Sequence, residues 1–157
     1  MADARVKPLY FKSYLAVIKN AVGANTYRNF YAEVDGVEKD ILEDGNLSCA
    51  FFVCSILFPF KLISDMHTTV ASTERDLRES GWDSIYNELH GVEEAREGDV
   101  IIWSEAIQAD GKSHEHIGFY IGDNQAVSNR DTDKTPQIHP FDYREIKAIY
   151  RSNKLKG

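Results

Sequence analysis

The chain has 157 residues, with 18 Lys and Arg against 25 Asp and Glu, so its net charge is -7. This length suits one domain, and we expect a single domain over residues 1–157. Its 43% hydrophobic and 27% charged residues exclude wholesale disorder, collagen-like repetition and a disulfide scaffold. The negative charge and the scattered Lys and Arg residues argue against nucleic acid and anionic membrane surfaces as partners.

The N-terminal stretch 1–7 has mixed charge and no apolar core, unlike a secretory signal. We therefore expect a cytoplasmic protein as the sequence stands, and an exported one if a leader has been removed. The longest nearly apolar run, 49–60, is shorter than the ~20 residues that span a bilayer. It predicts a core helix and no membrane span.

Helical patterns come first along the chain. Apolar residues recur at three- and four-residue spacing between Pro8 and Gly23, which predicts an amphipathic helix. In the stretch 29–41 the dipeptide Asp35-Gly36 favours a hairpin turn.

A buried helix is predicted from Cys49 onward, because the residues 45–48 supply turn and cap chemistry, with Ser48 directly before the helix. The run is apolar almost all round, so other elements must enclose it until Pro59 ends or kinks it.

A third helix is predicted over 72–80, with Ser72 or Thr73 as its cap, Glu74 and Asp76 in its first turn and a charged, exposed face. The acid-rich stretches 38–44 and 88–97 are interpreted as solvated surface.

The period changes to that of strands at Gly98. Strands are predicted over 99–103 and 116–121, then after a turn at 122–124 over 125–129, and further short strands near 137–139 and 148–150. Helices followed by an antiparallel sheet indicate the α+β class. No glycine-rich loop joins a strand to a helix, so we expect no nucleotide and no other cofactor.

Cys49 is the first candidate for chemistry. At the start of a buried helix, free backbone N–H groups and the helix dipole favour a thiolate, which suits a nucleophile. The alternative is that Cys49 is a small buried hydrophobe. Cys54 lies roughly 140° around the same helix among apolar residues, and we expect it to be inert core.

His116 is the second candidate, on a strand whose other face is apolar. Its side chain leaves the sheet on the side of Gly118 and Tyr120. Because a glycine within a strand often marks close approach of another backbone, we expect the amino end of the Cys49 helix at Gly118. This arrangement predicts a base beside a thiol.

Three segments of the chain resemble the NlpC-type cysteine peptidases of the papain-like superfamily, which are related to the CHAP amidases. They are 47–53 (LSCAFFV), 96–103 (REGDVIIW) and 116–122 (HIGFYIG). The resemblance covers residues 47–157 as a catalytic core and leaves 1–46 as an N-terminal helix and variable segment.

The resemblance implies a papain-like fold in which the helix of the nucleophile Cys49 packs on a C-terminal antiparallel sheet that carries the base His116. It also implies hydrolysis of an amide bond through a thioester, often in bacterial cell-wall peptides, so the expected substrate is a peptide or a peptidoglycan fragment. The chain departs from the family at Ser48 and at Ala50-Phe51, where the family commonly has Asp and Ser-Gly. The family's upstream tyrosine stays unassigned between Tyr27 and Tyr31.

A third residue usually orients the histidine, and two candidates remain open. A two-residue turn that pairs Gly122 with Gln125 puts Asn129 opposite Gly118 and on the His116 face. The spacing usual in the family selects Ser128 instead, which faces correctly only if the turn has an odd count or a bulge follows it. Asn129 offers the better acceptor, Ser128 the weaker, and Asp131 is a more distant third candidate.

Other functions remain open beside the hydrolase. The altered nucleophile motif favours an inactive papain-like domain that binds a peptide or a partner, and the same thioester would also serve an acyltransferase. His114 and His116 share a strand face and would make a metal site with Cys49 and His139, but no paired-cysteine motif accompanies them, and we expect no metal.

Overall fold

The computed structural model describes residues 3–86, 91–108 and 110–155, and its architecture confirms the α+β class. The helices are α1 (Tyr10–Asn20), α2 (Cys49–Leu57) and α3 (Val70–Glu79), with single 3-10 turns at Asn25–Tyr27, Phe58–Phe60 and Val92–Glu94. The main sheet contains β3 (Asp83–Ser84), β4 (Val100–Ile107), β5 (Ser113–Gly122), β6 (Gln125–Asn129), β7 (Pro136–Pro140) and β8 (Ile146–Arg151). Its strands are antiparallel in the order β3-β8-β4-β5-β6-β7.

Two apolar clusters cover opposite faces of this sheet. The larger joins α1, α2 and α3 to residues such as Ile102, Ile117 and Phe119. The smaller contains Trp103 and Tyr120, which alternate with the first set along β4 and β5. The sheet is therefore buried on both faces, and helix α2 packs on the face of Ile117 and Phe119.

Helix α1 confirms the predicted amphipathic helix, although it begins at Tyr10 rather than at Pro8. Its buried face carries Tyr14 and Ile18. The Tyr14 hydroxyl donates a 2.7 Å hydrogen bond to the carbonyl oxygen of Gly98, which ties the helix to the start of β4.

Helix α2 is enclosed as its apolar sequence predicts. Cys54 is fully buried, and its Sγ lies 3.4 Å from Oγ1 of Thr73 on α3, as expected of a core residue. Ser48 does precede the helix, but its side chain makes no capping hydrogen bond, because its backbone is already helical (φ -94°, ψ 0°) and not in the extended conformation of a capping residue.

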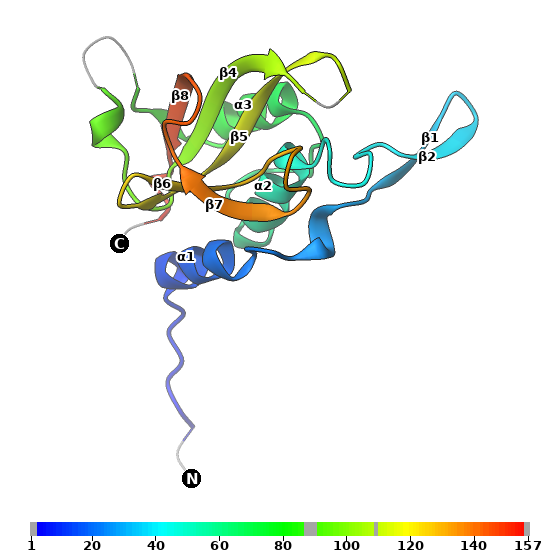
Figure 1. Cartoon of the computed structure of the whole chain (residues 1–157). Helices are drawn as coiled ribbons and strands as arrows, with labels where there is room; N and C mark the ends of the chain where they lie inside the picture. The colour runs from blue at the N-terminus through cyan, green and yellow to red at the C-terminus, as the bar shows by residue number, and fades with distance from the viewer. Residues whose placement is uncertain (1–2, 87–90, 109, 156–157) are drawn as a thin grey trace.

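The predicted hairpin at Asp35-Gly36 is confirmed. Strands β1 (Tyr31–Val34) and β2 (Val37–Asp40) pair across it, with φ of 52° at Asp35 and 79° at Gly36. Both values lie in the left-handed region that such a tight turn requires. The hairpin projects from the rest of the molecule (Figure 1).

Helix α3 differs from the prediction at its start. Thr69, not Ser72 or Thr73, is the cap, and its Oγ1 accepts a hydrogen bond from the backbone N–H of Ser72. Glu74 and Asp76 consequently lie in the middle of the helix, and both are buried. The exposed face of the helix is charged, as predicted, since it carries Arg75 and Glu79. They are buried because they have partners: the Tyr150 hydroxyl donates to Glu74, and Ser64 and His67 contact Asp76.

The acid-rich stretches are mostly exposed, as predicted, within the part of 88–97 that the structure describes; residues 88–90 lie outside it. Asp40 is half-buried, and its carboxylate accepts hydrogen bonds from the backbone N–H groups of Phe30, Leu42 and Asp44. None of the helices in the described residues is long and apolar enough to cross a membrane.

Candidate functional site

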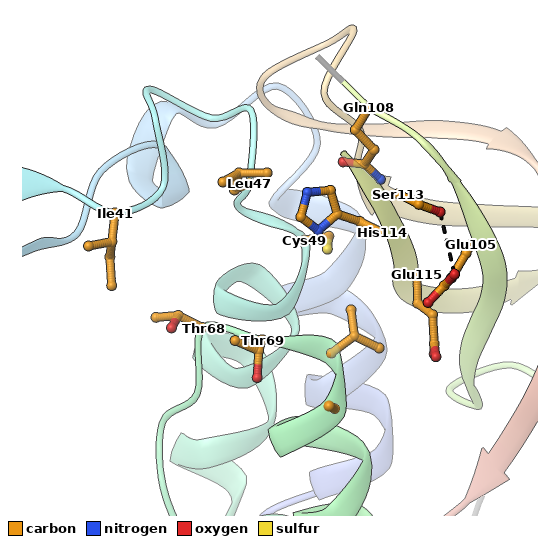
Figure 2. A pocket seen from close by; sticks show the side chains of 12 residues that line it. Ile41, Leu47, Cys49, Thr68, Thr69, Glu105, Gln108, Ser113, His114 and Glu115 are labelled. Atoms are coloured by element: carbon orange, nitrogen blue, oxygen red, sulfur yellow. Dashed lines mark hydrogen bonds between the residues drawn. The ribbon is translucent and has the colours of Figure 1, made fainter. Parts of the chain in front are cut away.

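Cys49 is the first residue of α2 and stays partly exposed. It lines a pocket of about 480 Å³ between the segment that follows β2, the start of α3 and the β4–β5 hairpin. Figure 2 shows its sulfur between the loop of Leu47 and the strand that carries His114 and Glu115. The other lining residues are Ile41, Thr68, Thr69, Val70, Ala71, Glu105, Gln108 and Ser113.

Burial raises the pKa of the Cys49 thiol to about 11. The backbone N–H groups of Ile117 and Ala50 and the charge of Arg144 act in the opposite direction, since each favours the thiolate. The expected thiolate at the helix end is therefore wrong for the free protein, because desolvation outweighs the N–H groups that a helix start provides. Cys49 rests as a protonated thiol at neutral pH.

His116 lies on β5 and is 2% exposed. Its ring packs against the indole of Trp103, with 5.3 Å between the ring centroids. Burial, followed by the positive charge of Arg144, lowers the pKa of His116 well below its usual range, so that the imidazole is neutral.

The space at Gly118 is not where the amino end of α2 approaches. A Cβ at Gly118 would lie 2.7 Å from the Cβ of Ser128 and 3.1 Å from the Trp103 ring, on the face away from the helix. The glycine instead lets β5 and β6 approach each other beside His116. The prediction of α2 at this position is wrong, since α2 packs on the Ile117 side of the strand.

The turn after β5 decides which residue accompanies His116. Gly122 does pair with Gln125, as predicted, but a bulge between Tyr120 and Gly122 shifts the register, so that Phe119 pairs with Val127. This shift puts Ser128 on the His116 face, and the expectation that Asn129 lies there is wrong. Asn129 is buried elsewhere, where its Nδ2 donates a 3.1 Å hydrogen bond to the Gly45 carbonyl oxygen.

Ser128 connects two histidines. Nε2 of His116 lies 2.8 Å from Oγ of Ser128, and Oγ lies 2.5 Å from Nε2 of His139 on β7. The second imidazole is itself held by the backbone, because its Nδ1 lies 2.8 Å from the carbonyl oxygen of Pro140. A hydrogen-bonded chain therefore runs from β5 through β6 to β7.

The thiol reaches β5 one residue away from His116. Its Sγ is within hydrogen-bonding reach of the Ile117 backbone N–H. Within residues 3–86, 91–108 and 110–155, no hydrogen bond joins the side chains of Cys49 and His116. The two predicted catalytic residues thus lie on contacting elements, α2 and β5, without a direct bond between them.

Tyr143 lies at the site with Arg130 and Arg144, although no sequence pattern predicts these residues there. The Tyr143 ring lies 4.5 Å from that of His139, and the guanidinium groups of Arg130 and Arg144 lie over it, 5.4 and 5.6 Å from its centroid. Its buried hydroxyl has no hydrogen-bond partner among the described residues. Charged residues flank Tyr143 on both sides in the sequence, which is typical of a surface loop. No local pattern therefore distinguishes it from an exposed tyrosine.

The two tyrosines left open for the family's upstream position lie differently. Tyr27 packs on the ring of Phe52 at 5.0 Å, in the core next to α2, and Tyr31 is exposed on β1. Within the part of the chain that the structure describes, neither makes a hydrogen bond or a ring contact with His116 or Ser128.

The residues considered for a metal are engaged separately. Nε2 of His114 lies 2.6 Å from a carboxylate oxygen of Asp110, whereas His116 and His139 share Ser128. In the described residues, no group of three or more His, Cys, Asp or Glu side chains could hold a metal ion.

No protein-family model matches the chain, and no curated protein matches it.

Proposed function

We propose that this protein is a thiol hydrolase that cleaves an amide bond, with Cys49 as nucleophile and His116 as base. The observation that carries the proposal is the position of Cys49. It begins a buried helix, lines a pocket of about 480 Å³ and contacts β5 at Ile117, next to His116. The resemblance of segments 47–53 and 116–122 to NlpC-type peptidases adds support and favours a peptide or peptidoglycan fragment as the substrate.

In the proposed reaction, His116 removes the thiol proton as Sγ of Cys49 attacks the carbonyl carbon. Because both side chains are neutral at rest, the proton moves when the substrate arrives, and no ion pair exists beforehand. Backbone N–H groups at the start of α2 stabilise the oxyanion. The C–N bond then breaks, the amine leaves with the proton from His116, and the acyl group remains on Sγ as a thioester.

Water completes the reaction by hydrolysing the thioester to a carboxylic acid, which releases the thiol. If an amine takes the acyl group instead, the same steps make the protein an acyltransferase. Mass spectrometry of the products distinguishes the two, because only hydrolysis adds the mass of water.

A second candidate function is a domain that binds a peptide or a partner without turnover. It is favoured by the raised pKa of Cys49 and by the absence, among the described residues, of a hydrogen bond from Cys49 to His116. In this case the pocket holds its ligand while the thiol stays protonated.

Alkylation by iodoacetamide tests the proposal. Peptide mass spectrometry follows Cys49 and Cys54 separately in the unaltered protein and in His116→Ala. We expect Cys49 to react at neutral pH and to lose roughly tenfold or more of its rate without His116. Cys54 is the internal control, because it is fully buried against Thr73 and should stay slow in both proteins.

The contrary outcome would favour the binding domain. In that outcome the alkylation rate of Cys49 is equal in the unaltered protein and in His116→Ala, and in both it rises only as the thiol itself ionises toward about pH 11. His116 would then take no proton from the thiol. Near-ultraviolet circular dichroism checks that the His116→Ala variant keeps its fold.

A further inference from the structure

The chain of hydrogen bonds that ends at Pro140 has a defined direction. The Pro140 carbonyl oxygen can only accept, so Nδ1 of His139, at 2.8 Å, must carry a proton. A neutral His139 then has a bare Nε2 with a lone pair. Burial lowers the pKa of His139 to about 4, so it is neutral at pH 7, although the bond to Pro140 opposes this shift.

The bare nitrogen of His139 determines what Ser128 does. The Ser128 hydroxyl lies 2.5 Å from it and donates its single proton there. Oγ of Ser128 can then only accept from Nε2 of His116, at 2.8 Å. His116 therefore carries its proton on Nε2 and its lone pair on Nδ1.

Nδ1 of His116 is available as a base. Among residues 3–86, 91–108 and 110–155, nothing donates a hydrogen bond to this nitrogen. A flip of the His116 ring, which would exchange the positions of Nδ1 and Nε2, is opposed by the Trp103 ring packed on it and by the hydrogen bond between Nε2 and Ser128. The positive charges of Arg144 and Arg130 further disfavour a doubly protonated ring.

We propose that His139 is a positioning residue: through Ser128 it holds His116 in the tautomer protonated at Nε2, which leaves Nδ1 to receive the proton of the nucleophile. The use of Nδ1 rests on the proposed function, whereas the tautomer does not depend on it. The segments that resemble known peptidases do not predict this role for His139, since it lies on β7, after the last of them.

Imidazole ¹⁵N NMR of the labelled protein at neutral pH tests the tautomers directly, because protonated and bare ring nitrogens differ strongly in chemical shift. We expect His139 to be protonated at Nδ1 and His116 at Nε2. In His139→Phe, which keeps an aromatic ring against Tyr143 and Trp103, Ser128 loses its acceptor and is free to donate to His116. The His116 proton should then shift to Nδ1, and alkylation of Cys49 should slow by roughly ten- to 100-fold.

His139→Gln is the matched variant, because its side-chain oxygen can accept from Ser128. It should restore Nε2 protonation of His116 and most of the alkylation rate, which a purely structural role for the ring would not explain. A His116 protonated at Nδ1 in the unaltered protein, or one unchanged in His139→Phe, would overturn the inference. The His116 tautomer is measured in the unaltered protein, so it tests the inference even if a variant does not fold.

The two proposals fail separately. If the tautomers and their shift are found as expected but alkylation of Cys49 does not depend on His116, the inference about His139 stands and the proposed hydrolase does not.

Discussion

Arg144 is the positive charge that acts on both Cys49 and His116. It lowers the pKa of the thiol and also that of the imidazole, although burial has the larger effect on each. Its guanidinium stays near the site because it lies over the Tyr143 ring and reaches the Ser104 carbonyl oxygen. One residue therefore favours the thiolate while it keeps the base neutral.

Replacing Arg144 with Met should remove the charge and keep the aliphatic stem on Tyr143. We expect the pKa of Cys49 to rise further, so that alkylation at a fixed pH near neutrality slows by about three- to tenfold. The pKa of His116 should rise as well, which NMR titration measures. Arg75→Met, at an exposed position on α3, is the control and should change neither; equal effects of the two variants would refute the role of Arg144.

At the scale of elements, Asp76 joins helix α3 to the loop before it. Its carboxylate accepts from the Ser64 backbone N–H at 3.0 Å, from the Ser80 hydroxyl at 2.8 Å and from His67 at 2.6 Å. Burial opposes ionisation of Asp76, but these hydrogen bonds outweigh it and hold its pKa below its usual range. The ionised carboxylate therefore stabilises the fold.

Asp76→Asn should lower the free energy of unfolding at pH 7 by about 2–4 kcal/mol, because buried donors lose a charged acceptor. Since the folded pKa is lowered, the contribution is complete above the unfolded value of about 3.9 and is lost as the pH falls below it. Urea unfolding at several pH values measures the difference. Glu79→Gln, at an exposed position on the same helix, is the control and should cost less than about 0.5 kcal/mol. If the loss of stability caused by Asp76→Asn does not shrink in acid, the Asp76 carboxylate does not stabilise the fold through its charge.

At the scale of the whole molecule, an ion pair connects the start of β4 to the end of β8. Arg151 binds both carboxylate oxygens of Asp99, at 2.9 and 2.7 Å, and the Asp99 side chain is only 2% exposed. Burial raises the pKa of Asp99 despite the hydrogen bonds from Arg151. The charged carboxylate is therefore tolerated because of its partner.

Arg151→Met should leave Asp99 charged and buried without that partner and cost about 3–5 kcal/mol at pH 7. A raised folded pKa gives a contribution that is present at low pH and lost as the pH rises through it, so the variant's loss should grow from acid to neutral pH. Adding Asp99→Asn should recover much of the loss. Thermal unfolding of the unaltered protein, the two single variants and the double variant at several pH values measures the coupling between Arg151 and Asp99. Strictly additive changes in stability would exclude this coupling.

Much of the fold and part of the site follow from local patterns in the sequence. The apolar run at α2, the alternation around His116 and the Asp35-Gly36 turn each indicate the observed element, because helix, strand and turn preferences depend on near neighbours. The positions of Cys49 and His116 on α2 and β5 were predictable in the same way. The start of α3 was not, because Thr69 and Ser72 compete as caps and burial of Asp76 depends on Ser64 and His67.

The sequence by itself determined the α+β class and placed Cys49 on a helix and His116 on a strand, since hydrophobic periodicity and chain order are local properties. Only the tertiary structure decided that Ser128 and not Asn129 faces His116, because one bulge between Tyr120 and Gly122 reverses the parity of the strand. It also decided that the Cys49 pKa rises and that His139 joins the site. Desolvation and contacts between β5, β6 and β7 depend on residues far apart in the chain, which no local pattern encodes.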